Sequence, residues 1–129
     1  EENFLKGAEK TLLLYFILNV EAKKTRSFIS LFSKKDYYFK FIKVMEDNGY
    51  LDENNDLEIP IIFFAGILNF LKNRGVIKKV NNIAIISDLK NDFNYQMSTA
   101  SFSSGVPHPT SESEKVLFDE LAKEFMISY

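Results

Sequence analysis

Apolar positions in the first half of the chain recur at helical spacing. They predict a first helix from Asn3 to Ala22, apolar all round between Leu12 and Leu18, as in an element packed on several sides. No turn residue flanks that run, which favours a helix over a strand. A short helix from Thr25 to Phe32 and a third helix from Asp36 to Asn48 are predicted to follow.

Two stretches then share one pattern: helix, glycine, apolar pair, polar turn and a second apolar stretch. They are VMEDNGYLDENNDLEI, from Val44, and FLKNRGVIKKVNNIAI, from Phe70. Gly49 and Gly75 are each expected to end a helix in the left-handed conformation that glycine adopts at little cost. The second of these helices is predicted from Pro60 to Arg74.

After each glycine, apolar residues flank a polar turn. We therefore predict β-hairpins over Tyr50 to Ile59 and over Val76 to Ile86, the latter turning at Asn81-Asn82. The alternative to a true repeat is two independent uses of a common helix ending, because glycine terminates helices in many proteins.

The C-terminal third divides into two parts. Ser98 to Thr110 is poor in apolar residues and rich in Ser, Gly and Pro, which predicts an extended linker or surface loop. Ser111 and Glu114 have the spacing of a capping box, and an amphipathic helix is predicted after them. Its apolar stripe needs a partner surface, on its own domain or on another copy. The predicted organisation is a core over 1–97, a linker over 98–110 and a C-terminal helix over 111–129.

Length and composition fit one domain with a large aromatic core, since 129 residues include 13 Phe and 6 Tyr. The absence of cysteine excludes disulfides, thiolate catalysis and thiolate metal sites. The longest apolar run, Leu12 to Leu18, is far shorter than the roughly 20 residues of a membrane-spanning helix. The chain starts at Glu1 without methionine, so we expect a trimmed or processed product, and a cytoplasmic location is the default expectation.

The net charge of −2 conceals strongly charged blocks. Successive segments carry −2 (1–22), +6 (23–45), −6 (46–58), +4 (59–87) and −4 (88–129). The overall charge argues against a dedicated nucleic-acid binder, for which a basic excess is typical. We nevertheless expect folding to gather the two basic blocks on one face.

The order helix, turn, helix, glycine and hairpin resembles a winged helix-turn-helix domain. The resemblance covers about 60 residues and rests on element order, with Thr25 to Phe32 as the second helix and Ser33 to Lys35 as the turn. It implies that Asp36 to Asn48 is the recognition helix and that Tyr50 to Ile59 is the wing. It further implies groove-facing or phosphate-facing roles for Lys34, Lys35, Lys40 and Lys43.

The acidic wing departs from this family pattern, because Asp52, Glu53, Asp56 and Glu58 would repel phosphates. The second unit carries basic residues at the positions that correspond to the acidic wing of the first unit. Its basic residues, which we add to the candidate nucleic-acid site, are Lys72, Arg74, Lys78 and Lys79. Basic residues on an amphipathic helix are also typical of a merely solvated face.

Other candidate chemistry is weak. His108 lies between two prolines without a second histidine and is expected to be a surface residue. Ser87 and Lys90 match a serine-x-x-lysine spacing without its companion motifs. The DENNDLE stretch starting at Asp52 alternates oxygen ligands, as a calcium loop does, but Leu57 replaces the required glycine. No enzyme activity, cofactor or metal is predicted.

The sequence thus predicts a mainly helical α+β fold with winged-helix-like helices, one or two β-hairpins and a C-terminal helix after an extended segment. The first functional hypothesis is a small regulatory domain that binds duplex DNA through its basic blocks. It predicts that reversing the charges of Lys40 and Lys43 together abolishes binding. The alternative is a protein-interaction or assembly module, including a homodimer through residues 111–129, without nucleic-acid contact. No membrane partner is expected.

Overall fold

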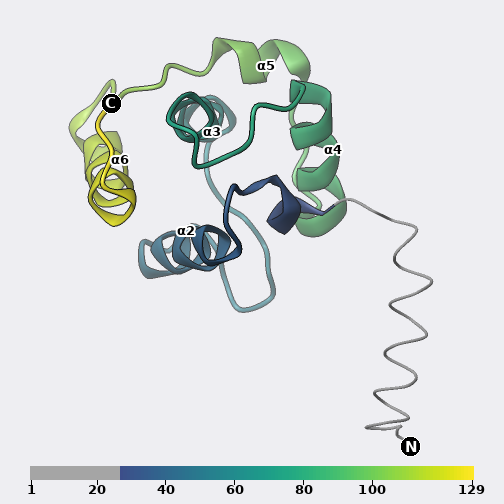
Figure 1. The fold of residues 1–129 in the computed structure, drawn as a ribbon, viewed down its shortest axis with the longest axis horizontal. Coiled ribbons are helices and arrows are strands. Elements are labelled where there is room, and N and C mark those ends of the chain that lie inside the picture. Colours follow the sequence, from purple (N-terminus) through teal and green to yellow (C-terminus); the bar gives the residue numbers. More distant parts are fainter. Residues whose placement is uncertain (1–26) are drawn as a thin grey trace, which may run out of the picture.

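A computed structural model describes residues 27–129, and the helix predicted from Asn3 to Ala22 lies outside them. The described chain forms one short 3-10 helix and five α-helices around a common core (Figure 1). These are η2 (Phe28–Leu31), α2 (Lys35–Asp47), α3 (Ile61–Asn73), α4 (Asn82–Phe93), α5 (Thr99–Ser104) and α6 (Glu112–Phe125).

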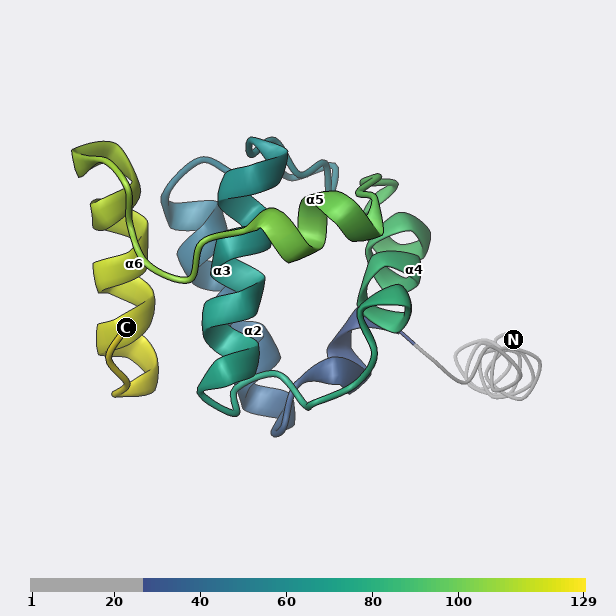
Figure 2. The same ribbon diagram turned by 90° about the horizontal axis from the view of Figure 1, so that it is seen from above.

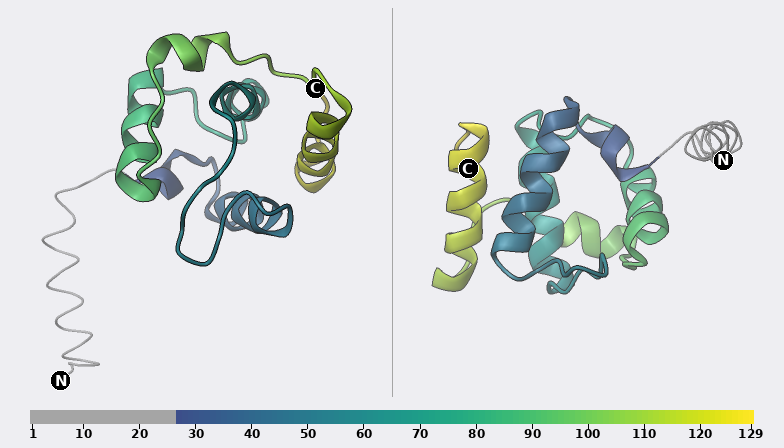
Figure 3. Two further views of the ribbon diagram at one scale, coloured as in Figure 1. Left: turned by 180° about the vertical axis from the view of Figure 1, so that it is seen from behind. Right: turned by 90° about the horizontal axis from the view of Figure 1, so that it is seen from below.

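Helices α2 and α3 run in opposite directions, with α6 along one side of the pair and η2, α4 and α5 towards the other (Figures 1 and 2). The same arrangement is seen from behind and from below (Figure 3). The turn that follows α2 and the turn that follows α3 therefore lie at opposite ends of the molecule.

Phenylalanine rings fill the space between these helices. Phe41 of α2 stacks on Phe64 of α3 with ring centroids 6.4 Å apart, and both side chains are buried. Phe118 joins α6 to α3, with its ring 5.4 Å from that of Phe70. Such aromatic pairs add about 0.5–1.5 kcal/mol each beyond the burial of their area.

Helix α3 is the central element and is almost fully buried from Phe63 to Leu71. Glycine allows the chain after α5 to approach it closely, since a Cβ on Gly66 would lie 2.3 Å from the Val106 carbonyl oxygen. The Asn69 amide donates to the carbonyl oxygens of Phe102 and Gly105, at 2.8 and 3.2 Å. These contacts hold α5 against α3.

The segment 98–110, predicted as a linker or surface loop, thus differs from its prediction. It contains α5, which is capped by the Ser98 hydroxyl accepting from the Ser101 amide. Phe102, the sole aromatic residue of the segment, is completely buried. A polar composition concealed a short helix that is anchored by one large side chain and by backbone contacts.

Both predicted helix-ending glycines are confirmed. Gly49 and Gly75 have φ of 80° and 81°. In each turn the glycine amide donates to the carbonyl three residues earlier, and the next amide donates to the carbonyl five residues earlier. Tyr50 donates to Met45 and Val76 to Leu71, both at 2.9 Å. This is the paired hydrogen-bond pattern of the Schellman motif.

The two hairpins, and with them the α+β class, are wrong. Residues 27–129 are helical, and their only β-pairings are two isolated bridges, Leu51 with Leu57 and Phe32 with Ile77. The segment assigned to the wing is a loop closed by one bridge. The second supposed hairpin is replaced by α4, because the Asn81 side chain accepts from the Ile83 amide at 2.9 Å and caps a helix instead of making a turn.

The helix predicted from Thr25 to Phe32 is reduced, within the described residues, to the single turn of η2. The Asp92 carboxylate accepts from the Phe28 amide at 2.7 Å and so holds this turn against α4. The predicted cap, Thr25, lies outside the described residues.

The predicted C-terminal helix is confirmed as α6, and the Ser111 hydroxyl accepts from the Glu114 amide at its start. Its apolar stripe packs on its own chain, against α2 and α3. The buried residues of this stripe are Leu117, Phe118, Leu121 and Phe125.

Candidate nucleic-acid interface

The two basic blocks meet where Phe32 pairs with Ile77. The Ser33 amide donates to the Val76 carbonyl at 2.9 Å, and the Lys78 amide donates to the Leu31 carbonyl at 2.8 Å. The Ser33 hydroxyl also donates to the Gly75 carbonyl at 2.5 Å. The start of α2 is therefore joined to the turn that follows α3.

We call the resulting surface the basic end, and Figure 1 is viewed towards it. It comprises six of the eight sequence-predicted site residues: Lys34, Lys35, Lys72, Arg74, Lys78 and Lys79.

Three of these side chains have structural partners. Lys34 places its ammonium 5.3 Å from the centroid of the Tyr37 ring. The ammonium of Lys72 donates to the Asn82 side chain at 2.8 Å, and the Arg74 guanidinium donates to the Ser128 carbonyl at 2.6 Å. These partners are neutral, and Lys34 and Arg74 are exposed. The Lys72 ammonium is part-buried and also lies 5.9 Å from the centroid of the buried Phe102 ring.

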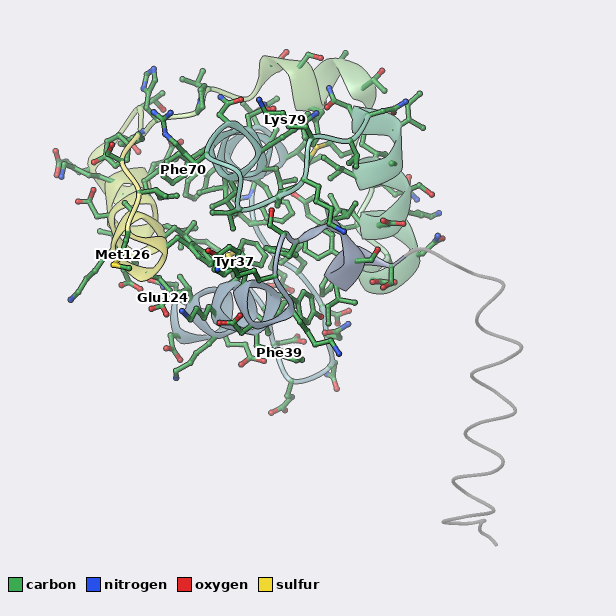
Figure 4. The ribbon with its side chains drawn as sticks, viewed as in Figure 1. Tyr37, Phe39, Phe70, Lys79, Glu124 and Met126 are labelled. Carbon is green, nitrogen blue, oxygen red and sulfur yellow. The ribbon has the colours of Figure 1, made fainter. Side chains whose placement is uncertain are left out.

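Lys35, Lys78 and Lys79 are exposed. Figure 4 labels Lys79 at the surface over the end of α3. Between residues 27 and 129 the ion pairs all involve other lysines, namely Lys40, Lys43 and Lys115. In this part of the protein, therefore, no carboxylate is salt-bridged to the basic end.

The structure does not bring the last two predicted site residues, Lys40 and Lys43, to this end. They lie about 8 and 12 Å further along α2 than Lys35, at 1.5 Å per helical residue. Lys40 pairs with Asp36 at 3.8 Å and Lys43 with Asp47 at 3.3 Å. The helix as a whole carries three basic and three acidic residues and is electrically neutral.

Lys40 and Lys43 instead line a groove of about 350 Å³ between α2 and α6. The other charged residues of this groove are Asp47, Glu120, Lys123 and Glu124, so that positive and negative charges balance. A phosphate backbone gains little from such a surface, because attraction and repulsion cancel within a Debye length of about 10 Å.

The turn that follows α2, from Asp52 to Glu58, lies at the opposite end (Figure 2), and we call it the acidic turn. Its four carboxylates are exposed: Asp52, Glu53, Asp56 and Glu58. One oxygen of Asp52 accepts from the amides of Asn54 and Asp56, at 2.8 and 2.9 Å. That oxygen therefore stabilises the turn backbone, and nowhere in residues 27–129 do three or more histidines or carboxylates gather in a way that could hold a metal. The calcium-loop pattern of the sequence is thus explained by a hydrogen-bonded polar turn.

Residues of the other weak motifs lie on the surface. His108 is exposed, as expected, and its Nδ1 lies 3.3 Å from the Pro109 carbonyl oxygen. Ser87 and Lys90 are exposed on α4. Within the described part of the chain, no helix is both long and apolar enough to cross a membrane.

Sequence reasoning missed Phe39, whose side chain is 57% exposed on α2. A helical projection contains the signal, because Phe39 lies on the face opposite Phe41 and Met45, which are buried. It also missed the pairing of Phe32 with Ile77, for which the local pattern holds no signal.

Comparison with known proteins gives no relative from which a role could be transferred: no protein-family model, curated protein or solved structure matches this chain.

Proposed function

We propose that this chain is a small, non-enzymatic DNA-binding module that contacts the phosphate backbone through its basic end. The observation that carries the proposal is the Phe32–Ile77 bridge, which joins two basic segments that are far apart in the sequence. Gathered cationic side chains release condensed counterions from DNA, and this release drives binding without any sequence preference.

The distribution of charge supports one orientation on DNA. The basic end attracts phosphates, whereas the acidic turn at the other end of the α2–α3 pair repels them. The net charge of −2 does not by itself oppose binding, because the segment 46–58, which carries −6, leads into the turn at the far end. Lys40 and Lys43, which are paired with Asp36 and Asp47, are not part of this interface, which moves the site from the body of the expected recognition helix towards its beginning.

The test is a fluorescence-anisotropy titration of random-sequence duplex DNA at about 50 and 200 mM salt, a range over which phosphate contacts lose most of their affinity. We expect binding at low salt that falls steeply with added salt and is abolished by Lys78→Glu with Lys79→Glu. The control is Lys90→Glu with Lys115→Glu, the same charge change on α4 and α6, which should retain most of the affinity. Equal losses of DNA affinity in the two double variants would contradict the proposed site.

A protein-interaction or assembly role is the second candidate, and the opposite charges of the two ends favour it. The basic end of one copy fits the acidic end of another, since complementary potentials steer association. A homodimer through α6 has less support, because the apolar stripe of that helix is buried in its own chain. End-to-end assembly predicts a mass that rises with concentration and falls with salt in light scattering, whereas a monomer at every concentration excludes it.

A further inference from the structure

An exposed aromatic ring lies one helical turn beyond Lys35, on the side of α2 that faces away from α3 and Lys79 (Figure 4). Phe39 has the most exposed aromatic side chain in residues 27–129, at 57%. It follows Lys35 by one helical turn and precedes Lys43 by another, so that the ring lies between two exposed lysines on the outer face of α2. Single exposed apolar residues are common on protein surfaces. Phe39 differs from such a residue in lying one turn from Lys35, which forms no salt bridge within residues 27–129.

The ring is also held in place. It forms a T-shaped pair with the ring of Tyr38, with centroids 5.2 Å apart and an interplanar angle of 77°. Tyr38 in turn packs on the buried rings of Phe28 and Phe32, at 6.3 and 5.7 Å. Phe39 is therefore the outermost member of an aromatic chain that extends from the core, and it is more than half exposed on the outer side of α2 (Figure 4).

The neighbouring tyrosine is neutral, whereas charged groups of both signs lie along α2 near this ring. Burial, with smaller contributions from Asp92 and Glu46, raises the pKa of Tyr38 and keeps its phenol neutral. Three carboxylates lie on the exposed side of α2 with the ring: Asp36, which is paired with Lys40, Asp47, which is paired with Lys43, and Glu46, two turns beyond Phe39. Phosphates are therefore favoured towards the beginning of α2 and disfavoured towards its end.

We propose that Phe39 is a stacking platform for an unpaired base, so that the module prefers single-stranded DNA to duplex. This inference rests on the proposed function and adds the class of nucleic acid. Proteins that bind single strands combine cationic side chains along the backbone with exposed aromatic rings, on which bases of any sequence stack. Bases in a duplex are already stacked on each other and offer no free face.

The first test is the affinity of wild-type protein and Phe39→Ala for oligo(dT) and for a random duplex of equal length, at low salt. We expect wild type to bind oligo(dT) more tightly. Phe39→Ala should lose at least about fivefold on oligo(dT), the lower limit for stacking of one base, and should stay within about twofold on duplex. Because the side chain is exposed, the variant is expected to fold, and an unchanged melting temperature checks this.

The second test reports the contact directly. The chain contains no tryptophan, so Phe39→Trp introduces a single tryptophan at the site, which can be excited selectively over the six tyrosines. Its emission should be quenched when oligo(dT) is added. Val116→Trp is the control, since Val116 of α6 is 55% exposed and lies outside the basic end; its emission should stay constant.

Three outcomes contradict the inference and are distinguishable. If wild-type protein binds neither nucleic acid, the proposed function fails as well. If it binds both but Phe39→Ala is unaffected and Phe39→Trp is no more quenched than Val116→Trp, the stacking role alone fails. If Phe39→Ala instead converts an oligomer into a monomer in light scattering, Phe39 is a contact between copies and not a stacking platform.

Discussion

The turn after α2 and the turn after α3 share one backbone geometry but differ in their pairing partner and in their charge. Both begin with a glycine near φ 80° and the same pair of hydrogen bonds. The first then pairs within its own loop, Leu51 with Leu57, and is acidic. The second pairs with a distant segment, Phe32 with Ile77, and is basic. A local ending is thus shared, whereas the pairing partner and the charge determine what each turn contributes.

The largest difference between the turns should appear when their bridging residues are shortened. Ile77 is fully buried, so Ile77→Ala should lower the free energy of unfolding by about 2–5 kcal/mol. Leu57 is only partly buried, and Leu57→Ala should therefore lose clearly less. Urea unfolding monitored by circular dichroism measures both. Equal losses would mean that the long-range bridge adds no more stability than the local one.

The shared part of the turns predicts a smaller and equal effect. Neither glycine has any atom within 4 Å of the position of an added Cβ, so only the left-handed backbone opposes substitution. Gly49→Ala and Gly75→Ala should each destabilise by about 1–2 kcal/mol. Gly49→Asn and Gly75→Asn are the controls and should lose less, because asparagine tolerates positive φ. A large loss of stability in only one of the two alanine variants would contradict the equal role that the shared geometry assigns to the two glycines.

The smallest expected change in stability concerns Tyr95, whose side chain holds the end of the acidic turn. The Tyr95 hydroxyl donates to the Ile59 carbonyl at 2.7 Å, and burial raises the pKa of Tyr95 to about 12. The ordinary pKa of 10.0 applies in the unfolded chain, so the neutral phenol stabilises the fold below pH 10 and this contribution is lost as pH rises through about 12.

Tyr95→Phe removes this titration together with the hydrogen bond, which is worth about 0.5–1.5 kcal/mol at neutral pH. The difference in unfolding free energy between wild type and variant should therefore shrink as pH rises above 10. Chemical unfolding across this pH range measures it, and the ionisation of lysines cancels in the difference. A constant difference would show that Tyr95 does not titrate as its burial requires.

Features set by short-range physics could be predicted from the sequence. Helix α2 was expected from Asp36 to Asn48 and is found from Lys35 to Asp47, since its apolar stripe and its terminal glycine are local signals. Helix α3 was expected from Pro60 to Arg74 and is found from Ile61 to Asn73.

Features that depend on distant partners could not be predicted. Asn81-Asn82 suits either a hairpin turn or a helix cap, and the choice follows from the burial of Ile85, Leu89 and Phe93 on one face of α4. The candidate site depends on contacts such as that of Ser33 with Gly75, which are 42 residues apart. The charge blocks were visible in the sequence, but not which lysines they would bring together. For this reason Lys40 and Lys43 were grouped with residues that the fold separates from them.

The most direct test of the basic end is the salt dependence of DNA binding in two matched double variants. Lys78→Gln with Lys79→Gln should reduce the slope of log affinity against log salt by about 2, because each phosphate contact contributes about 0.9. Lys40→Gln with Lys43→Gln removes the same charge from the face of α2 and should leave the slope unchanged. The opposite ranking, with the slope lost in the α2 variant and kept in the turn variant, would contradict the basic end and return the site to the face of α2.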